Sequence, residues 1–343
     1  MESAASRWPA LRGGLLALTA AALFGVGTPL VQRFGKGIGS LTTAALLYAG
    51  AALIGAALRR PAEQEARVKR RDGAKLALMA LFGAAIGPVA LAWGLQHTNG
   101  TSASLILTLE AVFTAALARL WYHETLDRRV ILAMALLTLG GAALVLDRAD
   151  AGAGQVLGLI VVMVATAAWG VDNTVSRALA ERDPGQVVMI KGGLGASATA
   201  VLAAAFDEPL PRLGPALGLL AVGASGYGLS LRFYLLAQRA FGAARTGSVF
   251  AFAPFVGATV AFMLGERSGS LWMLLGAALM VAGIVLHLAE SHSHEHEHAH
   301  THDDPHHAHI HSVPTARHSH LHRHEPMRHA HAHVPDDHHA HRH

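Results

Sequence analysis

The sequence predicts an all-α membrane protein of ten transmembrane helices, built as two inverted five-helix repeats and followed by a disordered, histidine-rich tail. The first observation behind this prediction is composition: the 343 residues are 52% hydrophobic and only 15% charged. A chain with so much apolar surface and long apolar runs is typical of a polytopic membrane protein. The second is that the apolar residues gather in ten segments, and the third is that motifs of the first half return in the second.

Each of the ten apolar segments has about 17 residues or more, the length that a helix needs to cross the bilayer core. The first segment begins after Arg7 and Arg12 and lacks a small-residue cleavage site followed by a soluble domain, so we expect it to stay in the membrane. The spans are predicted at Gly13–Gln32, Leu41–Leu58, Leu76–Gln96, Ser102–Tyr122, Val130–Leu146, Val156–Ser176, Val187–Phe206, Gly214–Ala237, Gly247–Leu264 and Leu271–Leu288.

Basic residues concentrate in every second loop. The longest loop, from Arg59 to Lys75, holds seven of them, and further basic residues follow at Arg128 and Arg129, at Arg177 and Arg182, and at Arg239 and Arg245. Because loops rich in Lys and Arg stay in the cytoplasm, both termini are predicted to be cytoplasmic, in a multi-pass protein of the cytoplasmic (inner) membrane. The basic residues therefore set topology, and we expect no nucleic-acid partner.

Two motifs recur at offsets of 142 to 145 residues. The segment from Leu18, LTAAALFGVGTPLV, aligns with MVATAAWGVDNTVS from Met163, and TLGGAAL from Thr138 aligns with MVAGIVL from Met280. Five spans per unit is an odd number, so the second unit enters the membrane upside down, as in many secondary transporters. The predicted parts are a cytoplasmic N-terminus (1–12), two repeats (13–146 and 147–289) and the tail (290–343).

The paired halves resemble the EamA family of the drug/metabolite transporter superfamily. The resemblance rests on the ten-span layout, on the aromatic-Gly pairs Phe24-Gly25 and Trp169-Gly170, and on the fourth-span pattern that ends in Glu124 and again in Gly265-Glu266. It implies a secondary transporter, and many family members export amino acids, metabolites or drugs. Pro254 matches a proline typical of the family, whereas the first half has Glu110-Ala111 at that level.

Glu110 stands near the middle of the fourth span, where a charge is expensive and is expected to face a partner, a proton or a cavity. One interpretation is a buried ion pair with Lys191 or, more favoured, Arg232. Arg119 is excluded as a partner because it points to the opposite side of the same helix, and both Arg119 and Lys191 are expected to extend toward the membrane surface. The other interpretation is a coupling carboxylate that takes up a proton or cation on one side of the membrane and releases it on the other.

Further residues are predicted to line the transport pathway. Asp172 and Asn173 could open the backbone near Gly170 and bind a cation or an amine, with Thr28 and Pro29 at the equivalent place in the first span, or they could be a helix-end cap. Trp93, Gln96, Tyr227 and Tyr234 could form cavity walls, or could belong to interfacial aromatic belts. The predicted pathway set is Glu110, Asp172, Asn173, Thr28, Pro29, Trp93, Arg232 and Pro254.

The tail carries 21 of the 24 histidines, in alternating runs. With so few apolar residues it cannot bury a core, and its imidazoles and interspersed carboxylates favour Zn, Ni, Co or Cu. The histidines predicted to bind metal are His292, His294, His296, His298, His300, His302, His306, His307, His309 and His311. The alternative is an inert, solvated tail.

Three functions remain open at this level. The favoured one is secondary transport, in the export direction, of a small metabolite or amino-acid-like solute, with the tail as a metal- or pH-responsive accessory. The second is divalent metal transport, which the spans support weakly because only His97, His123 and His287 lie outside the tail. The third is a membrane metal sensor. No enzyme motif is present, no cofactor is required, and the expected partners are a small-molecule substrate, the lipid bilayer and a second copy of the chain as a homodimer.

Overall fold

The computed structural model describes residues 4–61, 65–122, 128–149, 152–241, 243–266, 270–288, 294–299 and 317–322. The chain divides into two compact units, Met1–Leu288 and Ala289–His343. The first unit is helical and the second holds two short strands, and each is described by itself.

The first half of the helical unit ends with α7. Its elements are α1 (Ala4–Gly35), α2 (Ser40–Ala57), η1 (Arg70–Asp72), α3 (Gly73–Met79), η2 (Ala80–Ile86), α4 (Gly87–His97), α5 (Gly100–Ile106), η3 (Leu107–Leu109), α6 (Glu110–Tyr122) and α7 (Arg128–Ala149). The second half comprises α8 (Ala153–Ser176), η4 (Arg177–Leu179), α9 (Pro184–Ala205), α10 (Leu213–Val222), η5 (Gly223–Leu229), α11 (Ser230–Phe241), α12 (Ala243–Phe250), α13 (Ala253–Met263) and α14 (Leu271–Leu288).

Nine helical segments of the described residues are long and apolar enough to cross a membrane, where the sequence predicts ten. The tenth apolar segment, Leu271–Leu286 in α14, is shorter than the other nine. Large apolar side chains such as Leu53, Val201 and Leu274 lie exposed on the outside of the helices. In a protein with spans of this kind, such side chains are suited to contact lipid.

Four spans are interrupted at matching places in the two halves. The third and eighth spans each contain a seven-residue π-helical segment, η2 and η5, and their first residues, Ala80 and Gly223, lie 143 residues apart. The fourth span tightens at η3, and the ninth turns at Ala251 and Phe252 just before Pro254. The backbone is continuous where the sequence led us to expect an opening, because α1 runs through Pro29 and α8 runs through Asp172 and Asn173.

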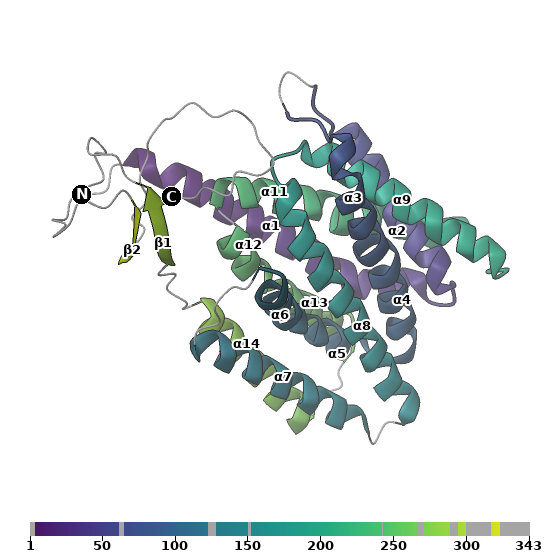
Figure 1. Cartoon of the computed structure of the whole chain (residues 1–343). Coiled ribbons are helices and arrows are strands. Elements are labelled where there is room, and N and C mark those ends of the chain that lie inside the picture. The colour runs from purple at the N-terminus through teal and green to yellow at the C-terminus, as the bar shows by residue number, and fades with distance from the viewer. Residues whose placement is uncertain are drawn as a thin grey trace. The chain divides into compact units, whose positions relative to one another are not determined.

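The helix contacts of the first half have equivalents in the second half. Helix α2 lies beside α9 and α7 beside α14 (Figure 1), α1 contacts α11 and α13, and α8 makes the equivalent contacts with α4 and α6. Glycines allow these close approaches: a Cβ on Gly25 would collide with Ala253, and one on Gly170 would approach Phe113 Cβ to 2.9 Å. The aromatic-Gly pairs of the sequence therefore mark the places where α1 and α8 touch the ninth and fourth spans.

The last span of each half forms a separate helix pair. A Cβ on Gly140 of α7 would approach Gly276 O of α14 to 2.8 Å, and a Cβ on Gly283 would approach Ala133 O to 3.0 Å. Small residues at such positions let two helix backbones approach closely. The glycines that the sequence places in these spans thus join α7 to α14 within one chain.

Part of the tail, which is predicted to lack regular structure, forms two strands in the described residues. Strands β1 (His294–Ala299) and β2 (Arg317–His322) pair antiparallel, with His294 opposite His322. Alternating sequences suit strands because successive side chains point to opposite faces. The sequence-based prediction weighed only the lack of a hydrophobic core, whereas backbone hydrogen bonds can form a two-stranded ribbon without one.

Candidate functional site

Glu110 and Asn173 meet at the centre of the helical unit. Glu110 is the first residue of α6, close to the middle of the span Gly100–Trp121, and is only partly buried. The side-chain amide of Asn173, in α8, donates a hydrogen bond to Glu110 Oε1. Two residues that the sequence singled out separately are therefore in contact, and the group that binds this carboxylate is neutral.

An ion pair lies beside them. Lys191 Nζ is 2.5 Å from Asp172 Oδ2, and the two side chains are 3% and 4% exposed. The prediction that Lys191 extends to the membrane surface is wrong, because Asp172 holds its ammonium inside the bundle. The other oxygen, Asp172 Oδ1, is buried and has no hydrogen-bond partner in the described part of the chain. Since a buried ion pair balances its own charge, Glu110 is the unbalanced carboxylate of this group.

The π-helical segment η2 contributes a backbone acceptor. The hydroxyl of Tyr48 and the indole Nε1 of Trp169 both donate to Gly83 O, the latter at 3.1 Å. A π-helical turn shifts the backbone hydrogen-bond pattern, which leaves carbonyls for side chains, and such turns are frequent at functional sites. A Cβ on Gly83 would overlap the Asp172 carboxylate, so this carboxylate packs directly on the η2 backbone. We call Tyr48, Gly83, Glu110, Trp169, Asp172, Asn173 and Lys191 the central polar cluster.

Aromatic rings border this cluster on the side of α1 and η5. The ring centroids of Phe24 and Trp169 lie 5.5 Å apart, those of Phe24 and Tyr227 lie 5.7 Å apart, and those of Tyr48 and Tyr227 lie 5.5 Å apart. The ammonium of Lys191 lies 6.0 Å from the centroid of the Tyr48 ring. The buried hydroxyl of Tyr227 lacks a partner in the described residues. Edge-to-face rings beside charged groups can bind a cationic or an apolar part of a solute.

Two predicted pathway residues lie elsewhere. In the described residues Glu110 is bound by Asn173 and not by Arg232, the favoured partner. Trp93 stacks on His97 near the end of α4, with ring centroids 3.8 Å apart. The sequence gives the depth of a residue in its span but not the neighbour that its face meets, so a pathway role for either residue stays a prediction.

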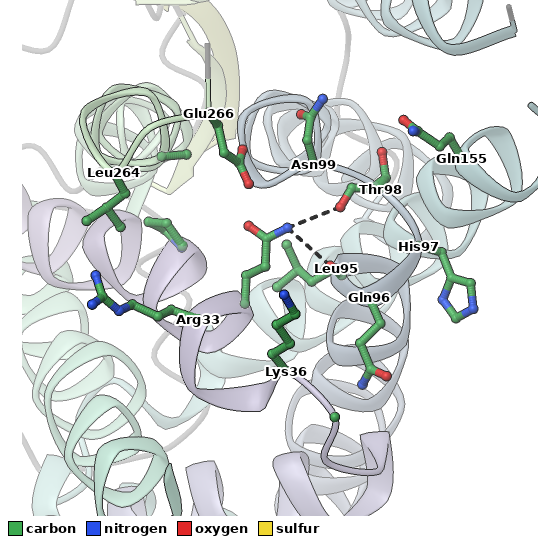
Figure 2. A pocket seen from close by; sticks show the side chains of 14 residues that line it. Arg33, Lys36, Leu95, Gln96, His97, Thr98, Asn99, Gln155, Leu264 and Glu266 are labelled. Atoms are coloured by element: carbon green, nitrogen blue, oxygen red, sulfur yellow. Dashed lines mark hydrogen bonds between the residues drawn. The ribbon is translucent and has the colours of Figure 1, made fainter. Parts of the chain in front are cut away.

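A cavity of about 750 Å³ lies at the end of the helical unit where α1 ends (Figure 2), and we call it the vestibule. Pro29, one of the predicted pathway residues, lines it, together with the basic residues Arg33 and Lys36. Gln32 Nε2 donates to Leu95 O at 3.2 Å and to Thr98 O at 3.1 Å, which ties α1 to the end of α4. The sequence singled out Pro29 and Gln96 but did not predict the vestibule as a whole, because its lining comes from four separate segments of the chain.

Glu266 also lines the vestibule, at the end of the ninth span. Its carboxylate accepts hydrogen bonds from the backbone N–H groups of Gly100, at 3.1 Å, and Thr101, at 2.9 Å. These N–H groups begin the fourth span and would otherwise lack partners. The Gly-Glu pattern of the sequence therefore connects the end of the ninth span to the start of the fourth.

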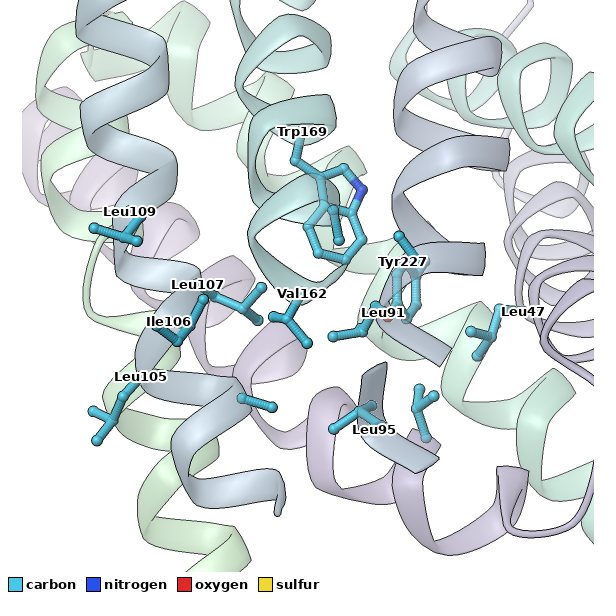
Figure 3. Close-up of a cluster of buried hydrophobic side chains, with 14 of the residues drawn as sticks. Leu47, Leu91, Leu95, Leu105, Ile106, Leu107, Leu109, Val162, Trp169 and Tyr227 are labelled. Atoms are coloured by element: carbon cyan, nitrogen blue, oxygen red, sulfur yellow. The ribbon is translucent and has the colours of Figure 1, made fainter. Parts of the chain in front are cut away.

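The vestibule and the central polar cluster are separated by apolar side chains. Leu95 lines the vestibule and also belongs to the buried core with Leu91 and Val162. Figure 3 shows Leu95 at one level, Leu91 and Val162 at the next, and Tyr227 and Trp169 beyond them. Leu95 therefore connects the wall of the vestibule to the apolar core, and the vestibule lining shares no residue with the central polar cluster.

Two further predicted pathway residues, Thr28 and Pro254, lie within helices. Thr28 is buried within α1. Pro254 stands in the first turn of α13, where its missing N–H costs no helix hydrogen bond.

In the described residues, no group of three or more His, Asp or Glu side chains is placed to hold a metal ion. Of the predicted metal ligands, His294, His296 and His298 lie in β1, and His292, His300, His302, His306, His307, His309 and His311 lie outside the described residues.

Comparison with known proteins agrees with this architecture. A protein from Methanothermobacter thermautotrophicus described as an uncharacterized transporter is 30% identical over 239 residues, which cover 67% of this chain and 68% of the relative. A solved structure described only as the crystal structure of a protein is similar in fold, with a TM-score of 0.58, 18% identity, and coverage of 81% of this chain and 98% of that chain.

The model of the EamA-like transporter family matches residues 11–146 and again residues 156–289. The two matches account for both halves of the helical unit, and the apolar helices agree with a multi-pass protein that handles a small molecule within a lipid bilayer. The chain therefore belongs to the EamA-like transporter family, and its activity is membrane transport of a solute.

Proposed function

We propose that this protein is a secondary active transporter in which Glu110 carries the coupling proton or cation. The observation that supports this proposal is the hydrogen bond between Glu110 and the neutral amide of Asn173, beside an ion pair that already uses Lys191. A carboxylate without a fixed countercharge at mid-membrane depth is suited to take up and release a cation. A carboxylate bound to an arginine would be held in its charged form.

The proposed mechanism uses two inverted repeats that rock against each other around this centre. Support comes from the two matches of the family model, from the equal spacing of η2 and η5, and from the helix contacts that are equivalent in the two halves. In transporters of this design, the solute site lies at the interface of the repeats, where interrupted helices expose backbone groups. Gly83 O, at such an interruption, is a group of this kind.

The proposed solute is a small metabolite or amino-acid-like molecule that is exported across the cytoplasmic membrane, with both chain termini in the cytoplasm. Asp172 Oδ1 and the hydroxyl of Tyr227, both buried without partners in the described residues, are available to an ammonium group of the solute. The rings of Phe24 and Trp169 offer the apolar surface beside them. This combination suits a molecule with one cationic end and an apolar portion.

The test is the variant Glu110→Gln, reconstituted into vesicles with a trapped pH indicator. Glutamine keeps the size and the hydrogen bond with Asn173 but cannot titrate. We expect a panel of amino acids to drive proton movement across the membrane of vesicles that contain the original protein. In vesicles with the variant, which is expected to fold and insert normally, the rate of proton movement should be at least about tenfold lower. The matched control is Glu181→Gln, because Glu181 is exposed at the end of a helix. Normal proton movement in Glu110→Gln would remove the coupling role.

Divalent metal transport is the second candidate, and the histidine-rich tail is the observation that favours it. The register of β1 and β2 sets His294, His296 and His298 opposite His322, His320 and His318. The tail then either supplies metal to the transporter or regulates transport of the organic solute as metal or pH changes.

A further inference from the structure

We propose that the vestibule is a binding site for the carboxylate of a small organic acid or amino acid, held by Lys36 and Arg33. This inference deepens the proposed function, on which it rests, because it names the anionic group by which the transporter recognises its solute. The predicted topology places the vestibule at the outer face of the membrane, because α1 starts in the cytoplasm and its other end lies at the vestibule.

The charge of the vestibule favours an anion. Lys36 and Arg33 are exposed basic residues that line it. In Figure 2 the ammonium of Lys36 points toward Leu95, the guanidinium of Arg33 lies at the opposite rim of the lining, and the ring of His97 points away. Glu266 is the acidic lining residue, and both of its oxygens already accept backbone hydrogen bonds. The described lining therefore has one net positive charge with His97 neutral, and that charge is open to a ligand.

Unused polar atoms at the same cavity indicate further ligand contacts. Thr98 lines the vestibule and is only 7% exposed, yet its hydroxyl has no hydrogen-bond partner in the described residues. The buried Oε1 of Gln155, another lining residue, also has none there. Buried polar atoms are nearly always paired, so a ligand or water in the vestibule is expected to bind them. A hydroxyl can donate to a carboxylate, and an amide oxygen can accept from an ammonium.

The remaining wall is apolar and limits the class of ligand. Pro29, Leu95, Ala261 and Leu264 line the vestibule beside the polar groups. A molecule with a carboxylate at one end and a short hydrocarbon chain at the other can contact both parts of the wall. The volume of about 750 Å³ is within the range of small-molecule sites and leaves room for water. None of the residues of the central polar cluster lines the vestibule, so the vestibule is a site separate from that cluster.

The experiment measures binding to the full-length protein in detergent by ligand-observed NMR, with three matched probes. They are L-leucine, 4-methylpentanoate, which lacks the amine, and 3-methylbutylamine, which lacks the carboxylate. We expect leucine and 4-methylpentanoate to bind with a Kd of about 1 mM or tighter and to compete with each other. The amine, which the central polar cluster can bind, is expected to displace 4-methylpentanoate at least about fivefold less effectively than leucine does. Displacement of 4-methylpentanoate by the amine as effective as that by leucine, or no binding of either carboxylate, would contradict the proposal.

Variants locate the site. The double change Arg33→Gln and Lys36→Gln is expected to raise the Kd of 4-methylpentanoate about tenfold, whereas Arg212→Gln leaves it unchanged. Arg212 is an exposed arginine in a loop that the topology also places outside, so this control removes a charge from the same face. An unchanged Kd in the double variant would overturn the assignment to the vestibule. Glu110→Gln should keep the Kd while losing proton coupling, so the two proposals can fail independently.

Discussion

At the scale of single residues, the buried pair of Asp172 and Lys191 limits what the centre of the protein can do. Both side chains are almost completely buried, and Asp172 packs on the backbone at Gly83. Breaking such a pair leaves one charge buried without its partner, which typically costs about 3 to 5 kcal/mol, while replacing both partners costs much less. The pair therefore keeps α8 and α9 together and leaves Glu110 as the group that can change its charge.

This balance predicts a non-additive stability effect. Asp172→Asn or Lys191→Met alone is expected to lower the free energy of unfolding by about 3 kcal/mol, and the double variant by less than either one. Thermal unfolding of the purified protein in detergent measures all three, with the exposed Glu181→Gln as the control. If the double variant lost the sum of the two single effects, the pair would not be coupled as the structure indicates.

At the scale of elements, glycines in the interrupted spans and in the helices packed on them carry the contacts between halves. A Cβ on Gly223, the first residue of η5, would collide with the carbonyl of Leu47 in α2, and a Cβ on Gly195 of α9 would approach Ala84 O of η2 to 2.7 Å. Backbone atoms cannot move aside as flexible side chains do, so these positions require glycine. The two π-helical segments are thereby pressed against the α2 and α9 pair.

Gly223→Ala is therefore expected to separate α2 from η5 and to lower the unfolding temperature in detergent by several degrees, since overpacking costs about 1 to 3 kcal/mol. Gly214→Ala is the matched control: it lies in α10 of the same span, where a Cβ meets nothing within 4 Å, and alanine favours the helix. Equal unfolding temperatures for the two variants would show that the contact at Gly223 does not limit the packing.

At the scale of the whole molecule, the tail is a unit of its own. It carries 21 histidines, and the ordinary pKa of an imidazole is roughly 6.5. Metal binds the neutral imidazole, so protons and metal compete for the same nitrogens. Acidification is thus expected to release metal and to make the tail strongly positive.

We expect the peptide 291–343 to bind several Zn or Ni ions at about pH 7.5 and to release them by about pH 5.5, below the imidazole pKa. Calorimetry measures the binding, and the same peptide with its histidines replaced by asparagine is the control. Deletion of the tail should change the metal dependence of transport in vesicles without changing which solute is carried. Loss of transport of the metal itself on deletion would favour the metal-transport alternative.

The sequence by itself determined the membrane class, the family and the special position of Glu110. Long apolar runs, a carboxylate in mid-span and motifs repeated at a near-constant offset are properties of residues close together along the chain, and helix periodicity converts them directly into structure. Asp172 and Asn173 were marked for the same reason, as polar residues inside an apolar run.

Only the tertiary structure decided which of these residues meet. In the structure Lys191 pairs with Asp172 and does not extend to the membrane surface, and Glu110 accepts a hydrogen bond from Asn173 and does not pair with Arg232. Helices α1 and α8 are continuous, whereas the third and eighth spans are interrupted at η2 and η5. The tertiary structure also formed the vestibule from segments as far apart along the chain as Pro29 and Glu266, which are separated by 237 residues. The physical reason is that the depth of a side chain follows from position along one helix, but its partner depends on how several helices rotate and pack, which is set by glycine contacts between distant spans.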